Sequence, residues 1–210
     1  MRVSAETKEA TRRRILAAAQ AMFTRNGYEA TRTHDISEAA GVATGTLFNY
    51  FPTKEAIATA IVAEALGQAH RQLEKGRRRR DASKSLEEQL FTLIATELRC
   101  LRPHRSYLAP VLETLSPLAR GASGSAGEML RAGHMQQVEH LFAALRSPEP
   151  PSFVARHLYW TLYAGVLAFW TKDSSRNQED TLAVLDCSLK AFVGSLPADK
   201  VSPPDSRRRN

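Results

Sequence analysis

Apolar residues recur every three or four positions along most of this chain, which is the spacing of one face of an α-helix. No stretch shows the alternating pattern of a strand, and no internal repeat is present. Small residues and prolines at 116–127 and 148–151 mark loops. The pattern therefore predicts an all-α fold, with two short helices within 31–51 and longer ones over 7–26, 53–75, 83–101, 104–115, 128–146, 152–172 and 179–196.

The two short helices within 31–51 are expected to form a helix-turn-helix. Ile36 and Ala40 share the apolar face of the first short helix, and Gly41 follows where a sharp turn needs positive φ. On the second short helix, Leu47 and Phe51 lie one turn apart. Neither apolar pair makes a core alone, so both helices must pack on a third, for which residues 7–26 are the candidate. Residues 43–51 then correspond to a recognition helix.

The opposite face of the 43–51 helix has a composition that suits contact with DNA. Gly45 costs about 1 kcal/mol against alanine inside a helix, which is reasonable where a ligand approaches the backbone. Thr46 and Asn49 can hydrogen-bond phosphates or base edges, and Asn49 has the length to pair with adenine. An ordinary helical hairpin leaves Gly45 and an exposed Phe48 unexplained.

Four segments together resemble the amino-terminal domain of TetR-type transcriptional regulators. They are GYEAT at 27–31, DISEAAGV at 35–42, TGTLFNYF at 44–51 and TKEA at 53–56, and the resemblance covers about fifty residues. It implies an all-helical homodimer with a DNA-binding head and a variable ligand-binding body. It also implies that the DNA contacts come from Arg32, Thr33, Thr44, Gly45, Thr46, Phe48, Asn49, Tyr50 and Lys54.

Three positions depart from the pattern of that family. Arg32 stands where a Ser or Thr commonly caps the first helix of the motif, so Thr31 or Thr33 is expected to cap instead. Ala43 replaces a frequent serine cap, and Phe48 replaces a frequent tyrosine that bonds a phosphate. For Asn49, contact with a phosphate remains the alternative to base reading, while Thr46, Tyr50 and Lys54 are expected to position the backbone.

The expected domain organisation is a head at 1–54, an effector-binding and dimerisation body at 55–196, and a disordered tail at 197–210. The net charge is +7, but arginine runs at 77–80 and 207–209 supply seven positive charges, so the rest of the chain is balanced. The first run is read as a solvated connector, with a phosphate contact as the alternative. The charge alone is therefore weak support for nucleic-acid binding.

The last two predicted helices carry the pattern of a dimer interface. The helix over 152–172 is apolar nearly all round, as expected for a helix buried from two directions, and two such helices from each subunit would form a four-helix interface. A purely internal core is the alternative. The expected interface residues are Leu158, Leu162, Gly165, Phe169, Leu182, Leu185, Leu189 and Phe192.

Aromatic and histidine side chains of the body form the candidate effector pocket. An apolar cavity with a few polar groups is the usual ligand site, although aromatic residues at helical spacing are more often simple core. The resemblance implies an effector, apolar or aromatic here; a regulator without effector, or an activator, stays open. The candidate lining residues are Tyr107, His134, Phe142, His157, Trp160, Tyr163 and Trp170.

The sequence gives no support to an enzyme, a cofactor or a metal site. No GxSxG, phosphate-binding glycine loop or HExxH motif is present, and His134 and His140 are six residues apart, on different sides of a helix. Cys100 and Cys187 stand in apolar helical patterns, where a structural role is expected and a redox switch is the alternative. No apolar run has the length to span a bilayer, and the amino terminus lacks the apolar block of a secretion signal, so a soluble cytoplasmic protein is expected.

Overall fold

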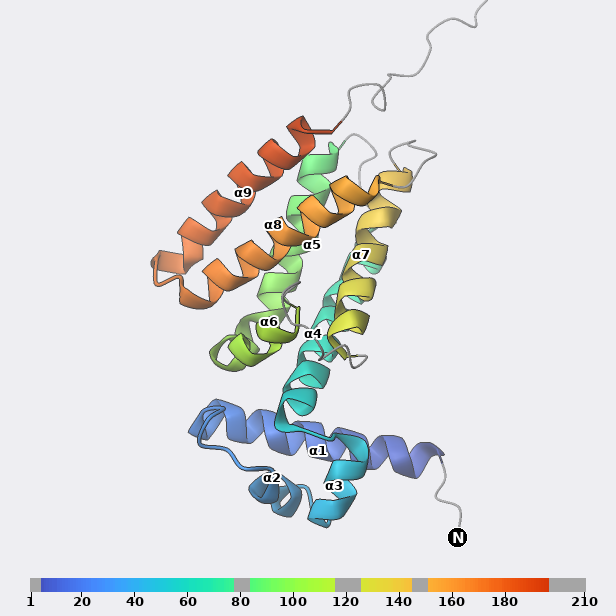
Figure 1. Ribbon diagram of the computed structural model, residues 1–210, viewed down its shortest axis with the longest axis vertical. Coiled ribbons are helices and arrows are strands. Elements are labelled where there is room, and N and C mark those ends of the chain that lie inside the picture. The colour runs from blue at the N-terminus through green and yellow to red at the C-terminus, as the bar shows by residue number, and fades with distance from the viewer. Residues whose placement is uncertain (1–4, 78–83, 116–125, 145–150, 197–210) are drawn as a thin grey trace, which may run out of the picture.

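The computed structural model describes residues 5–77, 84–115, 126–144 and 151–196. Every regular element in these ranges is a helix, as the sequence pattern predicts (Figure 1). In chain order the elements are α1 (Ala5–Asn26), α2 (Thr33–Ala39), α3 (Thr44–Tyr50), α4 (Lys54–Arg77), α5 (Leu86–Leu101), the 3-10 helix η1 (Arg102–Tyr107), α6 (Ala109–Leu115), α7 (Ala126–Ala144), α8 (Phe153–Lys172), the 3-10 helix η2 (Arg176–Gln178) and α9 (Glu179–Gly194).

The helices form a small head and a larger body, and α4 passes from one to the other. Figure 1 shows α1 lying across the base of the body, with α2 and α3 beneath it and α4 rising away from them. In the body α4 packs against α5, α6 and α7, while α8 and α9 lie side by side on the outer side. The helix α4 begins at Lys54, and the domain boundary expected after residue 54 stays a prediction.

The core of the head comes from one apolar stripe on each helix. Phe23 of α1, Ile36 of α2 and Leu47 of α3 are all fully buried. Gly27 and Gly41 end α1 and α2 with φ of +82° and +62°, values that glycine adopts without a Cβ penalty. The predicted helix-turn-helix is therefore present, and its recognition helix is α3, one residue shorter at each end than the predicted 43–51.

The segment predicted as one helix over 104–115 is divided in the structure. Pro103 stands in the first turn of η1, and Pro110 stands in the first turn of α6. Proline lacks the N–H that a helix interior needs but is tolerated in the first turn. The backbone N–H of Leu108 consequently bonds Arg105 three residues back, at 3.3 Å, which closes η1 before α6 begins.

The helix α5 begins later than predicted because it has a capping box that the sequence analysis overlooked. The hydroxyl of Ser85 accepts from the N–H of Glu88 at 3.2 Å, and the Glu88 carboxylate accepts from the N–H of Ser85 at 2.8 Å. The Ser-x-x-Glu spacing is the sequence signature of this motif. The helix therefore starts at Leu86 rather than at residue 83.

The helices α8 and α9 bury one face each inside the protomer and leave the other exposed. Three of the expected interface residues, Leu185, Leu189 and Phe192, are buried by the protomer itself, where α9 packs on α5 and α8. The prediction that these three residues lie in the dimer interface is therefore corrected, because the apolar stripe of α9 packs on α5 and α8 of the same protomer. Leu182 of α9 stays 40 % exposed.

Candidate nucleic-acid interface and body sites

The outer face of α3 carries the side chains expected to contact DNA. Gly45 and Asn49 are exposed, and Phe48 is 44 % exposed although it is a large apolar residue. Leu47 is fully buried on the opposite side and Phe51 is 5 % exposed, so the hydrophobic core fixes which face of α3 points outward. A ligand as large as a DNA duplex can therefore reach this face without any rearrangement of the head.

Thr44, Thr46 and Tyr50 are half-buried, and one of them is already hydrogen-bonded within the motif. The Thr44 hydroxyl lies 2.9 Å from that of Ser37, which in turn donates to the His34 carbonyl at 2.7 Å. This chain joins the first turn of α3 to the middle of α2. The arrangement fixes the angle between the two helices, so Thr44 has a structural task as well as a place on the predicted DNA face.

The expected threonine caps of α2 are absent, which corrects the sequence prediction. The N-cap residue is Arg32, which makes no side-chain cap bond; Thr33 is the first residue of the helix. The Thr31 hydroxyl donates instead to the carbonyl of Gly27 at 2.7 Å, because the preceding turn brings that acceptor closer than the helix end. Ala43 likewise begins α3 without a side-chain cap, and the side chain of Arg32 is exposed.

Lys54 makes hydrogen bonds within the protein, so a contact with a DNA phosphate is not the only role open to it. Its ammonium donates to the carbonyls of Tyr28 at 2.9 Å and Thr31 at 3.3 Å, and lies 4.1 Å from the centre of the Tyr28 ring. The Tyr28 hydroxyl donates to Glu55 at 3.0 Å. These contacts tie the loop between α1 and α2 to the first turn of α4. One of the three N–H groups of an ammonium remains for another partner.

The predicted effector residues do not form one open pocket. Tyr107, Trp160, Tyr163 and Trp170 are at most 1 % exposed and belong to the packed core, together with Phe142 at 9 %. His134 is also buried, but in a polar cluster described below. His157 is exposed on α8, beside the exposed Phe153 ring, with 6.1 Å between ring centres. It is therefore not part of a body cavity, because the buried face of α8 lies on its other side.

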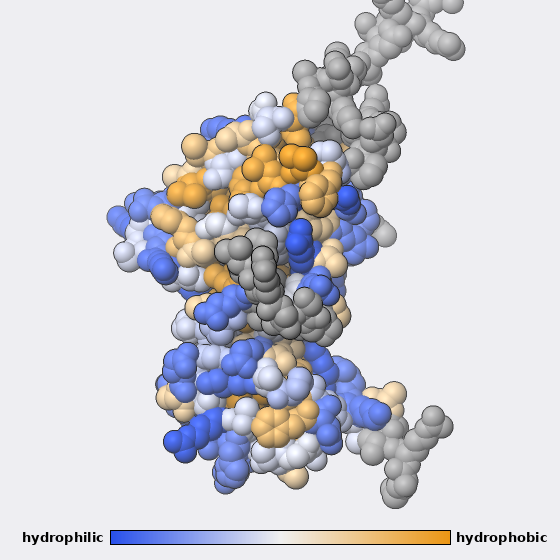
Figure 2. All heavy atoms as spheres, in the orientation of Figure 1, coloured by the Kyte–Doolittle hydropathy of each residue, from blue (hydrophilic) through white to orange (hydrophobic). Residues whose placement is uncertain are grey.

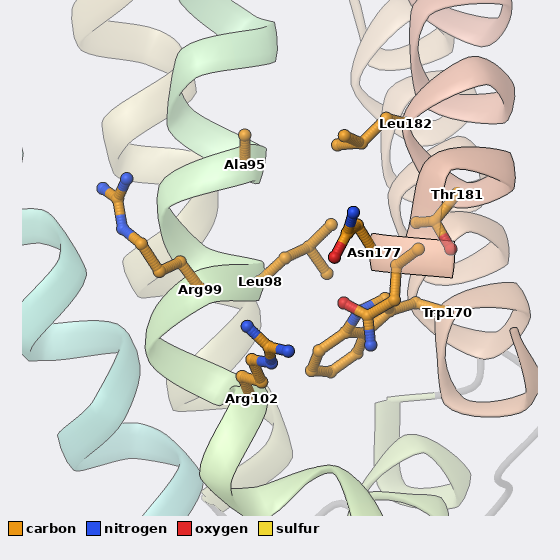
Figure 3. A pocket seen from close by; sticks show the side chains of 9 residues that line it. Ala95, Leu98, Arg99, Arg102, Trp170, Asn177, Thr181 and Leu182 are labelled. Atoms are coloured by element: carbon orange, nitrogen blue, oxygen red, sulfur yellow. The ribbon is translucent and has the colours of Figure 1, made fainter. Parts of the chain in front are cut away.

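A hollow that the sequence analysis missed lies where α5 faces η2 and α9 (Figure 3). It has a volume of about 140 Å³, and Trp170 is the one predicted effector residue among its lining side chains. The side chain of Arg102 points towards the Trp170 ring, whereas that of Arg99 points away. The remaining lining residues are Ala95, Leu98, Asn177, Gln178, Thr181 and Leu182.

The rim of this hollow includes two residues in a backbone conformation that L-residues rarely adopt. Asn177 and Gln178 have φ of 53° and 61°. The indole N–H of Trp170 donates to the side-chain oxygen of Gln178 at 2.9 Å, and this bond helps to hold the strained turn. Strained residues of this kind cluster at ligand sites. No pattern in the sequence signals this turn, because it depends on where α8 and α9 meet.

A buried carboxylate with two imidazole partners connects α4 to the body. Glu97 of α5 is fully buried; its Oε1 lies 2.6 Å from Nε2 of His70 on α4 and 2.9 Å from Nδ1 of His134 on α7. Burial by itself raises the pKa of Glu97, but attraction to His134 and His70 outweighs burial and holds the pKa at about 2. Glu97 is therefore ionised in the interior, where removal of one partner is costly.

The helix α8 encloses this polar cluster with tyrosines. The Tyr159 hydroxyl lies 3.1 Å from Nε2 of His134, and the Tyr163 ring stacks on His134 with 3.8 Å between centres. Burial and the charge of Glu97 raise the pKa of both tyrosines. Both hydroxyls therefore stay protonated at neutral pH and can act as hydrogen-bond donors.

Large apolar side chains are exposed along one side of α8 and at the start of α9. Figure 2 shows hydrophobic side chains gathered over the upper part of the body, whereas the head beneath is mostly hydrophilic. Leu158 is 46 % and Phe169 is 41 % exposed, and Gly165 lies between them on the same face. We call this surface of α8 and α9 the apolar face; it consists of the exposed Val154, Leu158, Gly165, Phe169 and Leu182 and the half-buried Leu162.

Over the part of the chain that the structure describes, no helix is both long and apolar enough to cross a membrane.

Known proteins resemble this chain in both sequence and fold. The family model described as "Bacterial regulatory proteins, tetR family" matches residues 15–61, which span most of α1 through the first part of α4. The HTH-type transcriptional repressor KstR of Mycolicibacterium smegmatis is 24 % identical over 203 residues, which cover 95 % of each chain.

Two solved structures extend the similarity to the whole fold. A TetR transcriptional regulator from Rhodococcus sp. RHA1 superposes with a TM-score of 0.67 at 21 % identity, covering 92 % of this chain and 100 % of the other. The Thermus thermophilus FadR, a TetR-family repressor in complex with lauroyl-CoA, superposes with a TM-score of 0.62 at 21 % identity, covering 91 % and 98 %.

A helix-turn-helix head on an all-helical body defines a transcriptional regulator, and its family and relatives are regulators rather than enzymes. The head of this chain, residues 15–61, matches the TetR family of bacterial regulatory proteins.

Proposed function

We propose that this protein is a homodimeric repressor that binds a pseudo-palindromic DNA operator and is released from it by a small effector. The observation that supports the proposal most is the face of α3, where Gly45, Phe48 and Asn49 are exposed while Leu47 is buried beneath them. A recognition helix in the major groove reads base edges through such side chains. Relatives over nearly the whole length carry the name of repressors.

The apolar face of α8 and α9 supports dimerisation. A large apolar surface on a protomer marks an interaction site, and a two-fold interface is self-complementary. Gly165 at its centre has no atom within 4 Å of the position of a Cβ, so open space lies above the backbone there. A two-fold dimer carries two copies of α3, one for each half of a palindromic site.

The hollow lined by Arg102 and Trp170 supports an effector with an apolar body and an anionic group. An aromatic ring and a guanidinium offer contacts to these two parts. The volume of about 140 Å³ is below the 300–1,000 Å³ typical of complete ligand sites, so the hollow serves as one subsite. Long-chain acyl-CoA combines the same two features, and it is the ligand in the complex of the T. thermophilus relative.

The operator is tested by selecting genomic fragments that the purified full chain retains, followed by gel-shift titration of each fragment. A shared palindromic sequence, bound more tightly than unrelated DNA, is the expected result. Binding that depends only on fragment length and salt would contradict the proposal, because that behaviour is typical of contact with phosphates alone.

The effector is tested by titrating acyl-CoAs of graded chain length into the complex with the operator. For Arg102→Ala, a higher concentration of acyl-CoA should be needed to release the protein from the operator. The matched control is Arg99→Ala, whose guanidinium points away from the hollow. If no acyl-CoA causes release, or if the two variants respond alike, the assignment of this subsite is wrong.

A further inference from the structure

Three side chains that commonly bind metals meet in the interior of the body. They are His70 of α4, Glu97 of α5 and His134 of α7, and their candidate ligand atoms all lie within 4.8 Å of one another. No metal site was expected from the sequence, because no HExxH motif is present and His134 and His140 lie on different sides of a helix. The three ligands come from three different helices, with a separation of 27 residues from His70 to Glu97 and of 37 from Glu97 to His134, so no short motif marks the cluster.

Two buried polar atoms beside this cluster have no hydrogen-bond partner. One is Oε2 of Glu97, and the other is the hydroxyl of Tyr163, whose ring stacks on His134. Buried polar groups are nearly always paired, so each unpaired atom requires an explanation. The Tyr163 side chain also interacts with that of Glu97, which contributes to the raised pKa of Tyr163. A bound cation gives Oε2 a partner, and a donor attached to that cation gives one to Tyr163.

The distances in the cluster suit a small ion after a minor adjustment. Tetrahedral Zn²⁺ binds imidazole nitrogen and carboxylate oxygen at about 2.0–2.2 Å, which places neighbouring ligand atoms roughly 3.3 Å apart. The two nitrogens now lie 2.6 and 2.9 Å from Oε1 of Glu97. The side chains therefore need to separate by less than about 1 Å, which rotation about side-chain bonds provides.

The surroundings of the cluster also match those of a metal site. A histidine that ligates a metal usually pairs its second nitrogen with another group, which fixes the ring, and Nε2 of His134 lies 3.1 Å from the Tyr159 hydroxyl. The side chain of His70 is 15 % exposed, so an ion can enter beside it. Nitrogen ligands favour Zn²⁺ and its neighbours over Mg²⁺ or Ca²⁺, which prefer oxygen.

We propose that His70, Glu97 and His134 bind one divalent transition-metal ion of the Zn²⁺ type, with a fourth position open towards the Tyr163 hydroxyl. Coordination requires Nε2 of His70 and Nδ1 of His134 to face the ion without a proton, so the affinity for the ion depends on pH. The site goes beyond operator binding and release by an organic effector, since neither of them requires a metal. Because His70 lies on α4, the ion joins the helix that leaves the head to two helices of the body.

Direct metal uptake tests the proposal without DNA. The full chain, freed of metal with a chelator, is titrated with Co²⁺ and then with Zn²⁺, while visible absorption and heat are measured. One Co²⁺ per protomer with the absorption of a tetrahedral complex, displaced by Zn²⁺, is the expected result. His134→Gln and His70→Ala should each weaken binding by more than about tenfold, because even changes beyond the ligands cost 10–100-fold.

The matched control is His140→Gln, an exposed histidine on the same helix as His134. Circular dichroism shows whether each variant is folded. If His134→Gln unfolds, His70→Ala still tests the site, because His70 lies at the edge of the core. Absence of stoichiometric uptake by the unaltered chain overturns the proposal. Equal affinities for the unaltered chain and the His70 and His134 variants also overturn it, because the ion then binds elsewhere. Operator binding by metal-free protein is measured separately, so failure of the metal site leaves the proposed repressor function intact.

Discussion

His70 on α4 and Glu97 on α5 lie 2.6 Å apart, Nε2 to Oε1, where α4 has left the head and entered the body. The head contacts the first half of α4, where Lys54 bonds the loop between α1 and α2 and Arg12 of α1 pairs with Glu64 at 2.7 Å. The body holds the same helix through a buried charged group. The helix α4 therefore runs from the segment that follows α3 to the buried cluster, and we expect a change at Glu97 to alter the position of the head.

This coupling predicts that Zn²⁺ changes the affinity of the protein for its operator. If the ion favours one position of α4, the change should be between about fivefold and 150-fold, and operator binding should alter Zn²⁺ affinity by the same factor. His70→Ala should remove the effect, and His140→Gln should retain it. Fluorescence anisotropy of labelled operator at fixed free Zn²⁺ measures the change. Equal operator affinity with and without the ion would show that α4 is not coupled to the cluster.

Asn49→Ala is expected to relax base preference at one position of each half-site. An asparagine paired with adenine through both amide atoms discriminates against other bases by roughly 1–3 kcal/mol. Binding to operators that vary one base at a time measures this preference, with Asn26→Ala, an exposed asparagine at the end of α1, as control. A uniform loss over all operators, with preferences intact, would assign Asn49 to a phosphate instead.

Lys54→Ala should destabilise the protein by about 1–2 kcal/mol, because it removes two charged hydrogen bonds and an aromatic contact that are partly screened by solvent. Urea unfolding measures this loss, and Lys8→Ala, on the exposed part of α1, is the matched control. Lys54→Ala also tests the phosphate contact that the sequence predicts for this lysine. A salt slope of operator binding lower by about one unit would show that contact, and an unchanged slope would leave Lys54 a structural residue.

Leu158→Asp should convert the proposed dimer to monomers, since it places a charge within the apolar face. Light scattering with size exclusion measures the mass of the protein in solution. In gel shift, the variant should lose the preference of the unaltered chain for a complete palindrome over a single half-site. Ala132→Asp, exposed on α7, should leave the dimer intact. A monomeric unaltered chain would refute the role of this face.

The environment of the Asp173 carboxylate leads us to expect a loss of stability at acid pH. Hydrogen bonds with the side chains of Ser175 and Thr181 hold the pKa of this carboxylate below the ordinary value, helped by the bonds that it accepts from the N–H groups of Ser175 at 2.8 Å and Thr181 at 2.9 Å. A lowered pKa in the folded state contributes stability above the unfolded pKa near 3.9, and this contribution disappears as pH falls through the folded pKa.

Thermal unfolding between pH 7 and the acid limit measures the contribution of Asp173. Asp173→Asn should lower the melting temperature at neutral pH and should flatten its decline on acidification. Asp180→Asn, an exposed carboxylate in the first turn of α9, is the control and should preserve the decline. If the Asp173 and Asp180 variants decline in parallel, the hydrogen bonds to Ser175 and Thr181 contribute no pH-dependent stability.

Local sequence was sufficient to predict the head. The buried side of α3 was predictable because Leu47 and Phe51 are one turn apart, and the turn before it because Gly41 needs positive φ. Such features depend on residues within a few positions of each other, and they leave Asn49 on the outer face whatever the body does. The same local rules failed for α2, where Thr31 binds Gly27 instead of capping the helix.

In the body, sequence determined that helices form, and tertiary structure decided what each face contacts. The apolar stripe of α9 was visible, but only packing shows that Leu185 turns inward against α5 and α8 while Leu182 stays exposed. His134 and His157 looked equivalent, yet one lies in the interior beside Glu97 and the other lies at the surface. Helical periodicity identifies a face but not its partner, because the partner comes from a distant part of the chain. For that reason the cluster of His70, Glu97 and His134 is recognised only once the packing of α4, α5 and α7 is known.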